Sequence, residues 1–384
     1  MPRVLVDATA VPADRGGVGR YVDQLLPALA ELGADLAVVC QVRDEPFYRE
    51  LVPGARVVTA PEGVARRPAR LAWEQAGLPR VARQVGAEVL HCPHYTMPLA
   101  ARLPVVTTLH DATFFTHPEV HQRVKRVFFR AWTEVSLRRA ARCVVPSRAT
   151  LDELARVARG VHGQVEVAHH GVDAARFHVP SAEEVAAARQ HLGLRAGRYV
   201  GFLGTIEPRK NVPALIEGWQ RAVADLPDPP ALVLAGGRGW DERVDDVLAR
   251  VPDHLEVLRP GYLPLELLAG FLGGAEVLAY PSLAEGFGLP VLEAMACGAP
   301  VLTTRSLALP EVGGDAVAYT GYDAAAIGDR LGALLADPDE RARLSAAAVA
   351  RAAGFTWRAC AEQHLNAYAA AAAPRRGRRG PDVG

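Results

Sequence analysis

The chain has 384 residues, half of them hydrophobic and 22% charged, with 43 basic and 43 acidic side chains. This length suits two α/β domains, and the zero formal net charge argues against a nucleic-acid partner. The five cysteines are too scattered for a disulfide framework or a zinc site and predict reduced thiols in a cytoplasmic protein: Cys40, Cys92, Cys143, Cys297 and Cys360.

In the first half, short β-rich apolar runs alternate with helical stretches, as in parallel sheets covered by helices. The chain opens directly on a strand pattern, so we expect no signal peptide, and no apolar run approaches the roughly 20 residues of a membrane span. The predicted strands are Arg3–Val6, Leu36–Val42, Arg56–Thr59, Val89–His91, Val105–Leu109, Cys143–Pro146 and Val165–Ala168. The predicted helices include Tyr21–Leu32, Leu71–Val85, Val120–Ala141 and Arg148–Ala158.

A charged helix at Ser181–Leu192 separates this half from a second one, and we place the domain boundary near residues 174–196. The second set of predicted strands is Tyr199–Leu203, Pro230–Ala235, Leu255–Leu258, Val277–Tyr280, Val301–Thr303 and Ala316–Tyr319. The sequence therefore predicts two doubly wound, Rossmann-like α/β domains, residues 1–175 and 176–355, whose strand ends face each other across a cleft. A helix at 356–373, expected to pack back on the N-terminal domain, and a disordered Arg-, Gly- and Pro-rich tail at 374–384 follow.

A glycine cluster, Gly16-Gly17-Val18-Gly19, lies between the first predicted strand and the first predicted helix. Its spacing fails the G-x-G-x-x-G dinucleotide fingerprint, because Val22 stands where the last glycine is required. This failure disfavours the alternative of a dinucleotide-dependent dehydrogenase. By itself the cluster is equally well explained as a flexible turn.

The segment Thr108-Leu109-His110-Asp111 ends a predicted strand, where a side chain can face the cleft. A histidine at such a position can hydrogen-bond a sugar hydroxyl and share a proton near neutral pH. One of twelve histidines, taken alone, is more often structural.

Residues 121–143 carry seven Arg or Lys side chains and three aromatic ones against a single acid, Glu134. The pattern fits a surface that meets anionic lipid and a lipid-linked acceptor. It also fits a solvated basic helix with buried aromatics, which is the commoner structure.

A basic pair, Arg209-Lys210, follows a predicted strand in the second half and opens a helix. A guanidinium beside an ammonium suits a diphosphate leaving group, although basic pairs in loops are most often solvated. The chain contains 41 arginines and only two lysines, so the presence of Lys210 favours a function.

The most informative segment runs from Glu285 to Glu293 and contains Gly286-Phe287-Gly288-Leu289-Pro290. Pro290 suits the first turn of a helix, so the amides of residues 287–289 would point out of a helix N-terminus, where anions bind. Glu293, about one turn into the helix, can accept hydrogen bonds from ribose hydroxyls.

This spacing of two glutamates around Gly-Phe-Gly-Leu-Pro resembles the signature of retaining GT-B glycosyltransferases, in particular glycosyltransferase family 4. The resemblance covers almost the whole chain, and it implies that Glu293 holds the nucleotide ribose. The implied catalytic residues are His110, Glu285, Arg209 and Lys210. The implied donor-binding residues are Gly16, Gly17, Gly204, Arg209, Lys210, Glu285, Gly286, Phe287, Gly288, Leu289 and Glu293.

The resemblance also implies partners. The Glu-Pro-Arg-Lys-Asn wording at 207–211 is similar to members that use GDP-mannose, with a UDP-sugar-dependent glucosyl or N-acetylglucosaminyl transferase as the alternative. Asp111 is an expected contact of the acceptor, which can be a glycan, a lipid-linked sugar or a small molecule. No cofactor or metal is expected, and a non-catalytic sugar-nucleotide-binding protein is a further alternative. The enzyme is expected in the cytoplasm, with peripheral contact at the inner face of the membrane as an option. The family often has asparagine at position 170, so the role of His170 stays open.

Overall fold

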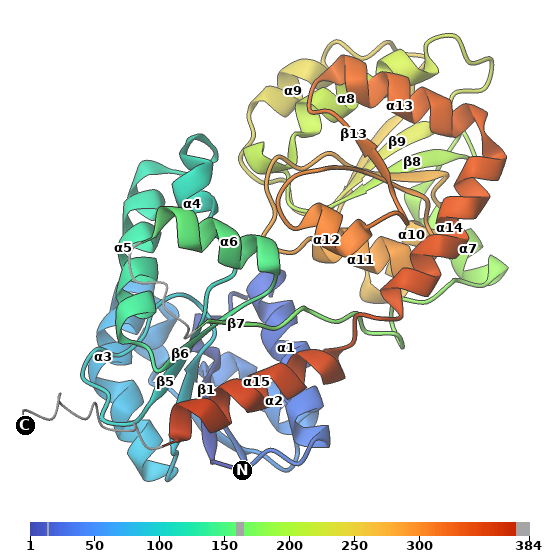
Figure 1. Ribbon diagram of the computed structural model, residues 1–384. Helices are drawn as coiled ribbons and strands as arrows, with labels where there is room; N and C mark the ends of the chain where they lie inside the picture. The colour runs from blue at the N-terminus through green and yellow to red at the C-terminus, as the bar shows by residue number, and fades with distance from the viewer. Residues whose placement is uncertain (14, 159–164, 374–384) are drawn as a thin grey trace, which may run out of the picture.

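The computed structural model describes residues 1–13, 15–158 and 165–373 and confirms two Rossmann-like α/β domains (Figure 1). The predicted tail at 374–384 lies outside the described residues. The N-terminal sheet has the order β3-β2-β1-β4-β5-β6-β7, and its neighbouring strands pair in parallel. Its strands are β1 Val4–Asp7, β2 Leu36–Cys40, β3 Arg56–Thr59, β4 Val89–Cys92, β5 Val105–Thr108, β6 Arg142–Val145 and β7 Val165–Val167.

The C-terminal sheet is also parallel and has the order β10-β9-β8-β11-β12-β13. Its strands are β8 Tyr199–Leu203, β9 Ala231–Ala235, β10 Val257–Gly261, β11 Val277–Tyr280, β12 Val301–Thr304 and β13 Ala318–Thr320. The direction of winding reverses between β1 and β4 in one sheet and between β8 and β11 in the other. Ligands of doubly wound sheets bind at such reversal points, outside the carboxyl ends of the strands.

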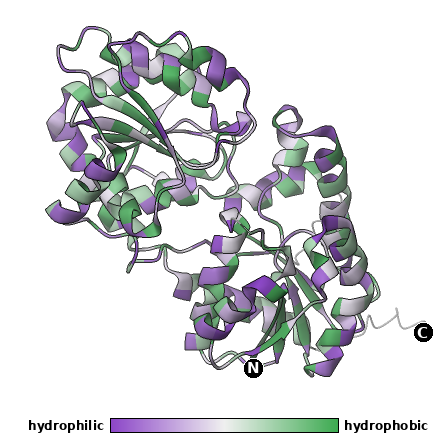
Figure 2. Ribbon diagram, turned by 180° about the vertical axis from the view of Figure 1, so that it is seen from behind, coloured by the Kyte–Doolittle hydropathy of each residue, from purple (hydrophilic) through white to green (hydrophobic). Residues whose placement is uncertain are grey.

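Helices cover both faces of each sheet, and Figure 2 shows mostly hydrophobic strands between helices with hydrophilic outer faces. The helices of the N-terminal half are α1 Gly16–Glu31, α2 Glu45–Leu51, α3 Arg67–Gln84, α4 Thr113–Thr116, α5 Arg123–Arg139 and α6 Arg148–Val157. The later helices are α7 Ala182–Leu192, α8 Val212–Val223, α9 Arg243–Leu248, α10 Leu268–Gly273, α11 Leu289–Ala296, α12 Leu309–Gly313, α13 Ala324–Ala336, α14 Pro338–Ala352 and α15 Trp357–Ala372. Within the described ranges, none of them has the length and apolarity needed to cross a bilayer.

Several helix and strand bounds differ from the sequence prediction; for example, α3 begins at Arg67 rather than Leu71, and α5 begins at Arg123 rather than Val120. Two of the differences have a clear physical reason. Helix α1 begins at Gly16 rather than Tyr21, so the glycine cluster forms its first turn instead of a loop. Three glycines are poor helix formers, but the residue before them, Arg15, is fixed by ion pairs with Asp23 and Asp44. Strand β10 begins at Val257, two residues later than predicted, because the buried Leu255 marks the approach to the sheet and not yet its ladder.

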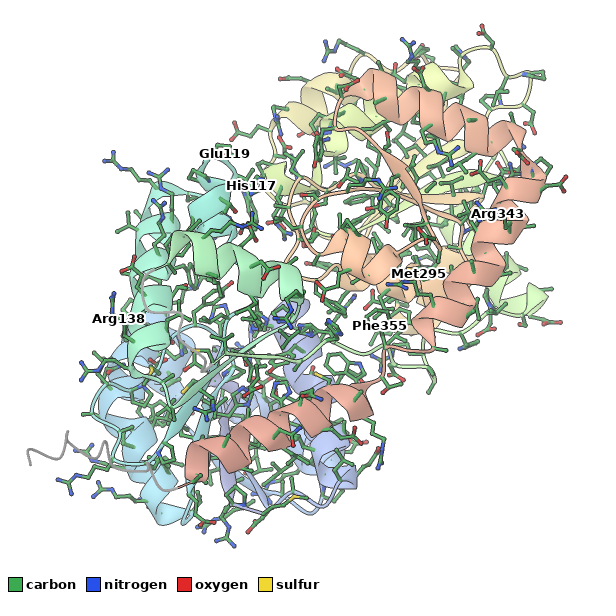
Figure 3. The ribbon with its side chains drawn as sticks, viewed as in Figure 1. His117, Glu119, Arg138, Met295, Arg343 and Phe355 are labelled. Carbon is green, nitrogen blue, oxygen red and sulfur yellow. The ribbon has the colours of Figure 1, made fainter. Side chains whose placement is uncertain are left out.

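The chain crosses between the domains twice, at residues 168–177 and again before α15. The two crossings lie side by side: the amide of Val172 donates to the carbonyl of Phe355 at 3.1 Å, and Figure 3 labels Phe355 at this crossing. A Cβ on Gly171 would lie 2.1 Å from the backbone nitrogen of Trp357, so only glycine permits this approach. Helix α15 then packs with β1 and α1 in one apolar core of the N-terminal domain.

A buried chain of hydrogen bonds also ties α15 to the N-terminal domain. In order of donation its members are Tyr368, His91, Thr108, Tyr21 and His364, ending at the carbonyl of Cys360, with separations of 2.8, 2.8, 2.9, 2.6 and 2.8 Å. A carbonyl only accepts, so the last bond fixes the proton of His364 on Nδ1 and, with neutral rings, the direction of every other bond. Burial lowers the pKa of both histidines, that of His364 to about 4, and keeps them neutral near pH 7.

Candidate active site

The basic pair and the first glutamate of the motif meet at the winding reversal of the C-terminal sheet. Arg209 and Lys210 lie in a short 3-10 helix, Pro208–Lys210, which follows β8, and Glu285 follows the adjacent strand β11. Lys210 Nζ donates to Glu285 Oε1 at 2.6 Å, and Arg209 Nη1 lies 2.5 Å from Glu285 Oε2. The structure therefore brings Glu285 to an adjacent pair of basic residues, of which Lys210 lies 75 positions earlier in the chain.

Glu285 is buried, with 7% of its surface exposed, and it is ionised. Ser282 and Tyr280 add hydrogen bonds to its Oε1 at 2.7 and 2.9 Å. Burial opposes the charge, but Arg209 and Lys210 outweigh burial and lower the pKa of Glu285 to about 2. Tyr280 ends β11 and Ser282 lies three residues before Glu285, so both functional hydroxyls stand just ahead of the motif. Their position next to the motif is the signal that could have identified them.

The cations of this cluster are already neutralised by carboxylates. The guanidinium of Arg209 also contacts Glu207 Oε1 at 2.7 Å and the carbonyl of Ala284 at 2.8 Å. Burial opposes the charge of Arg209, but Glu285 and Glu207 raise its pKa well above the ordinary value. Two cations and two carboxylates leave the cluster without net charge. The ammonium of Lys210 donates to Glu285 and Tyr280, which uses two of its three N–H groups and leaves one for a ligand.

The loop after Glu285 leads into α11 and exposes backbone donors. Gly288, with φ of 98°, is the residue before the helix, and no side chain caps the first amides of α11. Pro290 has no N–H, and the amides of Val291 and Leu292 donate to the carbonyl of Gly288 at 3.0 and 3.2 Å. The amides of residues 287–289 are therefore the ones that can bind an anion, which the helix dipole favours. The ring of Phe287 is 5% exposed and packs 5.0 Å from the ring of His170, so only its backbone faces a ligand.

Gly286 has a different role from that of a flexible turn. A Cβ at this position would lie 1.9 Å from the carbonyl oxygen of His110 in the other domain. The close approach of the two domains therefore requires glycine at position 286. Gly204, at the end of β8, lies against the backbone of Gly236 within the C-terminal domain.

Glu293 pairs across the domain interface with Arg20 of α1. Nη1 of Arg20 lies 2.7 and 2.8 Å from the two carboxylate oxygens. Burial raises the pKa of Glu293 although Arg20 opposes the shift. The pair lines a small cavity of about 30 Å³ that also touches Leu289, Asp173 and Arg176. Arg20 follows the glycine cluster directly in the sequence, but nothing in the sequence identifies Glu293 as its partner.

Gly16 and Gly17 lie in the first turn of α1, one turn before Arg20, and no side chain caps this helix start. The amides at this helix start point out of a helix N-terminus on the N-terminal domain, a geometry that suits an anion.

His110 follows β5 and carries its proton on Nε2, because that atom lies 2.7 Å from the carbonyl of Pro93. Burial lowers the pKa of His110, so Nδ1 is an acceptor that suits a sugar hydroxyl. The imidazole of His170 lies parallel to that of His110, with centroids 6.2 Å apart. Nδ1 of His170 is buried and has no hydrogen-bond partner among the described residues.

Asp111 is held by its neighbours. Its amide donates to the hydroxyl of Tyr95 at 2.9 Å, and its Oδ1 accepts from the hydroxyl of Thr113 at 2.7 Å. His121 Nε2 lies 2.8 Å from the same Thr113 hydroxyl. Asp111 lies against the donor-side loop of the other domain, because a Cβ on Gly286 would lie 2.9 Å from the Cβ of Asp111.

The residues described by the structure contain no group of three or more His, Cys, Asp or Glu side chains arranged to hold a metal ion. Asp337, which begins a D-x-D string, instead caps α14 by accepting from the amide of Glu340 at 2.8 Å.

This arrangement, two facing Rossmann-like domains with a basic pair and a helix N-terminus at one winding reversal, defines a GT-B glycosyltransferase. Residues 15–176 match the model of Glycosyltransferase Family 4, and residues 184–351 match that of Glycosyl transferases group 1. The chain belongs to glycosyltransferase family 4 and is an enzyme of that kind.

Named relatives are similar over most of their length. The O-antigen chain mannosyltransferase B of Escherichia coli is 31% identical over 78% of this chain and 77% of its own. A D-inositol 3-phosphate glycosyltransferase of Xylanimonas cellulosilytica is 31% identical over 93% and 92%. Sucrose-phosphate synthase of Thermosynechococcus elongatus shares the fold, with a TM-score of 0.76 at 23% identity over 96% of this chain and 98% of that one.

Proposed function

We propose that the enzyme transfers a mannosyl group from GDP-mannose to an acceptor hydroxyl, with retention of the anomeric configuration. The observation that carries the proposal of a nucleotide-diphosphate sugar is the buried cluster of Arg209, Lys210 and Glu285 beside the uncapped start of α11. The similarity to a mannosyltransferase and the Glu-Pro-Arg-Lys-Asn wording support the sugar and the base.

In this proposal the diphosphate lies between Lys210 and the amides of residues 287–289 at the start of α11. Charge that builds on the departing diphosphate is stabilised there by the third N–H of Lys210 and by the helix N-terminus. Glu293 binds the ribose hydroxyls, and Nδ1 of His110 accepts from a hydroxyl of the sugar. Arg209, already shared between Glu207 and Glu285, mainly holds Glu285 in place.

The acceptor binds on the N-terminal domain, with Asp111 accepting from one of its hydroxyls. The Thr113 and Tyr95 contacts fix Asp111 before the acceptor arrives, which lowers the ordering cost of binding. Because Asp111 lies against Gly286 of the loop that follows Glu285, we expect the acceptor hydroxyl and the donor to meet between the domains.

The test is a donor-hydrolysis screen across GDP-, UDP- and ADP-sugars with product configuration followed by NMR. We expect turnover to be fastest with GDP-mannose and to release α-mannose. Faster turnover with a UDP-sugar would replace mannose with the glucosyl or N-acetylglucosaminyl alternative. An unfolding temperature raised by NAD but by no sugar nucleotide would favour the dehydrogenase, and binding without any turnover would indicate a non-catalytic protein.

The exposed side of α5 supports a lipid-borne acceptor. Val124 and Val127 are 82% and 60% exposed beside the exposed Arg123, whereas Phe129 and Trp132 pack toward the core. Apolar and cationic side chains on one helix face suit an anionic bilayer. We expect sedimentation with phosphatidylglycerol vesicles that Val124→Asp abolishes; equal recovery with and without vesicles would remove the membrane from the proposal.

A further inference from the structure

The carbonyl of Gly286 in the donor loop is held by the other domain. Ser147, the residue before α6, donates to it at 2.7 Å, and Thr150, in the first turn of α6, donates at 3.1 Å. Both hydroxyls are buried, with 0% and 1% of their residues exposed. The loop that joins Glu285 to α11 therefore takes part of its hydrogen bonding from the N-terminal domain.

A second contact fixes the same turn of α6. Glu311 of α12, in the C-terminal domain, accepts from the amides of Arg148 and Ala149 at 2.8 and 3.0 Å. The carboxylate thus caps a helix of the opposite domain, and His169 lies 2.5 Å from it. The first turn of α6 therefore contacts the C-terminal domain twice, through Gly286 and through Glu311.

A third contact, between Gly286 and the carbonyl of His110, leaves no space for the loop to shift. Gly286 presses against the carbonyl of His110, where a Cβ would lie 1.9 Å from the oxygen. The amides of residues 287–289 follow directly, so a rotation of the Gly286 peptide would turn them away from the diphosphate. Catalysis through preorganised donors is sensitive to such small displacements.

We infer that Ser147 and Thr150 are positioning residues, which orient the Gly286–Leu289 loop for leaving-group stabilisation only when the domains are docked. This inference rests on the proposed function and extends it, because it makes the donor site dependent on the acceptor domain. Domain docking would then complete the catalytic loop.

The experiment compares Thr150→Val with Thr150→Ser and with Thr133→Val. Thr133 is a matched control, because its hydroxyl is buried in α5 and has no hydrogen-bond partner among the described residues. We expect Thr150→Val to lower kcat about five-fold with little change in the KM for the donor, because one neutral hydrogen bond is lost. Thr150→Ser should restore kcat, and the unfolding temperature should match that of Thr133→Val.

Hydrogen exchange gives a readout that does not need activity. Amides of residues 286–289 should exchange about five-fold faster in Thr150→Val than in Thr133→Val, with other regions unchanged. Unchanged exchange, or a kcat equal to that of the wild type, would overturn the inference. If the wild type turns over no nucleotide-diphosphate sugar while exchange at the loop still rises, the proposed function fails and the positioning role stands.

Discussion

Glu285 and Glu293 belong to one motif, but they lie in two contrasting regions of the site. Glu285 is surrounded within its own domain by Lys210, Arg209 and two hydroxyls, and its pKa is lowered to about 2. Glu293 reaches one cation, Arg20, from the other domain, and burial raises its pKa. Side-chain exposure is 8% or less for Lys210 and Glu285 but 38% for Arg20.

The contrast separates a prebuilt part of the site from an adjustable part. The Glu285 cluster is formed by two adjacent strands of one sheet and needs no ligand to be complete. The Glu293 pair depends on how the domains meet, and under the proposed function a ribose would take over the oxygens that Arg20 now occupies. Four substitutions, in order of decreasing effect, can sharpen or break this comparison.

Lys210→Ala should produce the largest change. It removes the ammonium that faces the leaving diphosphate, so we expect kcat/KM for donor hydrolysis to fall by about 10²- to 10³-fold. Arg221→Ala, which removes an exposed cation paired with Asp329 in the same domain, is the control and should keep wild-type rates. A Lys210→Ala rate within three-fold of the wild type, roughly 0.7 kcal/mol in the barrier, would contradict the assignment.

Glu285→Gln should destabilise the fold by about 3 kcal/mol at pH 7, because a pKa lowered from 4.5 to about 2 corresponds to that free energy. This stabilisation is complete above the unfolded pKa and is lost as the pH falls through about 2. The difference in unfolding free energy between wild type and variant should therefore shrink between pH 5 and pH 2. Urea titrations at several pH values measure it, and a constant difference would refute the ion-pair account.

Glu293→Gln should act in the opposite direction on stability. A raised folded pKa favours the protonated form, so the contribution of Glu293 is fully present below its unfolded pKa and is lost as the pH rises through the folded pKa. At pH 7 we expect the variant to be as stable as the wild type or more stable by about 1 kcal/mol, yet to bind GDP more weakly. Calorimetry measures both quantities. A loss of stability as large as that of Glu285→Gln would end the distinction between the two regions.

Arg20→Gln should have the smallest effect. The partly exposed pair contributes at most about 1 kcal/mol, so removing the competitor for Glu293 should tighten GDP binding by less than about five-fold. The control is Arg221→Gln, which breaks a surface pair with Asp329 and should leave the affinity unchanged. Weaker binding in Arg20→Gln would show that Arg20 contacts the donor rather than competing with it.

The fold could be predicted from the sequence because local patterns of apolar residues determine its strands and helices. Arg56–Thr59, Tyr199–Leu203 and Val277–Tyr280 are strands with the predicted bounds, since buried parallel strands are short apolar runs between breakers. The predicted start of α1 was wrong, because a glycine cluster is typical of a loop. The contacts that fix Arg15 come from residues 8 to 33 positions away, which a local pattern does not include.

The sequence predicted the site residues that lie in one motif, but it could not predict the contacts that form between the domains. Glu285 and Glu293 were chosen from their spacing, but nothing local distinguishes their environments. The hydroxyls of Ser147 and Thr150 are 139 and 136 positions from the carbonyl that they hold. Similarly, the partner of Arg20 lies 273 positions away. Only the packing of the two domains against each other determines these pairs.

The return of α15 to the first domain has a consequence for the order of folding. Val4, Val38 and Val89 share a core with Trp357 and Tyr368, so residues 1–175 alone leave an apolar sheet face bare. During synthesis the C-terminal sheet can fold before α15 of the N-terminal domain has been synthesised. The N-terminal domain would then complete its folding last. A chain truncated before residue 357 would expose an apolar surface that chaperones and proteases recognise.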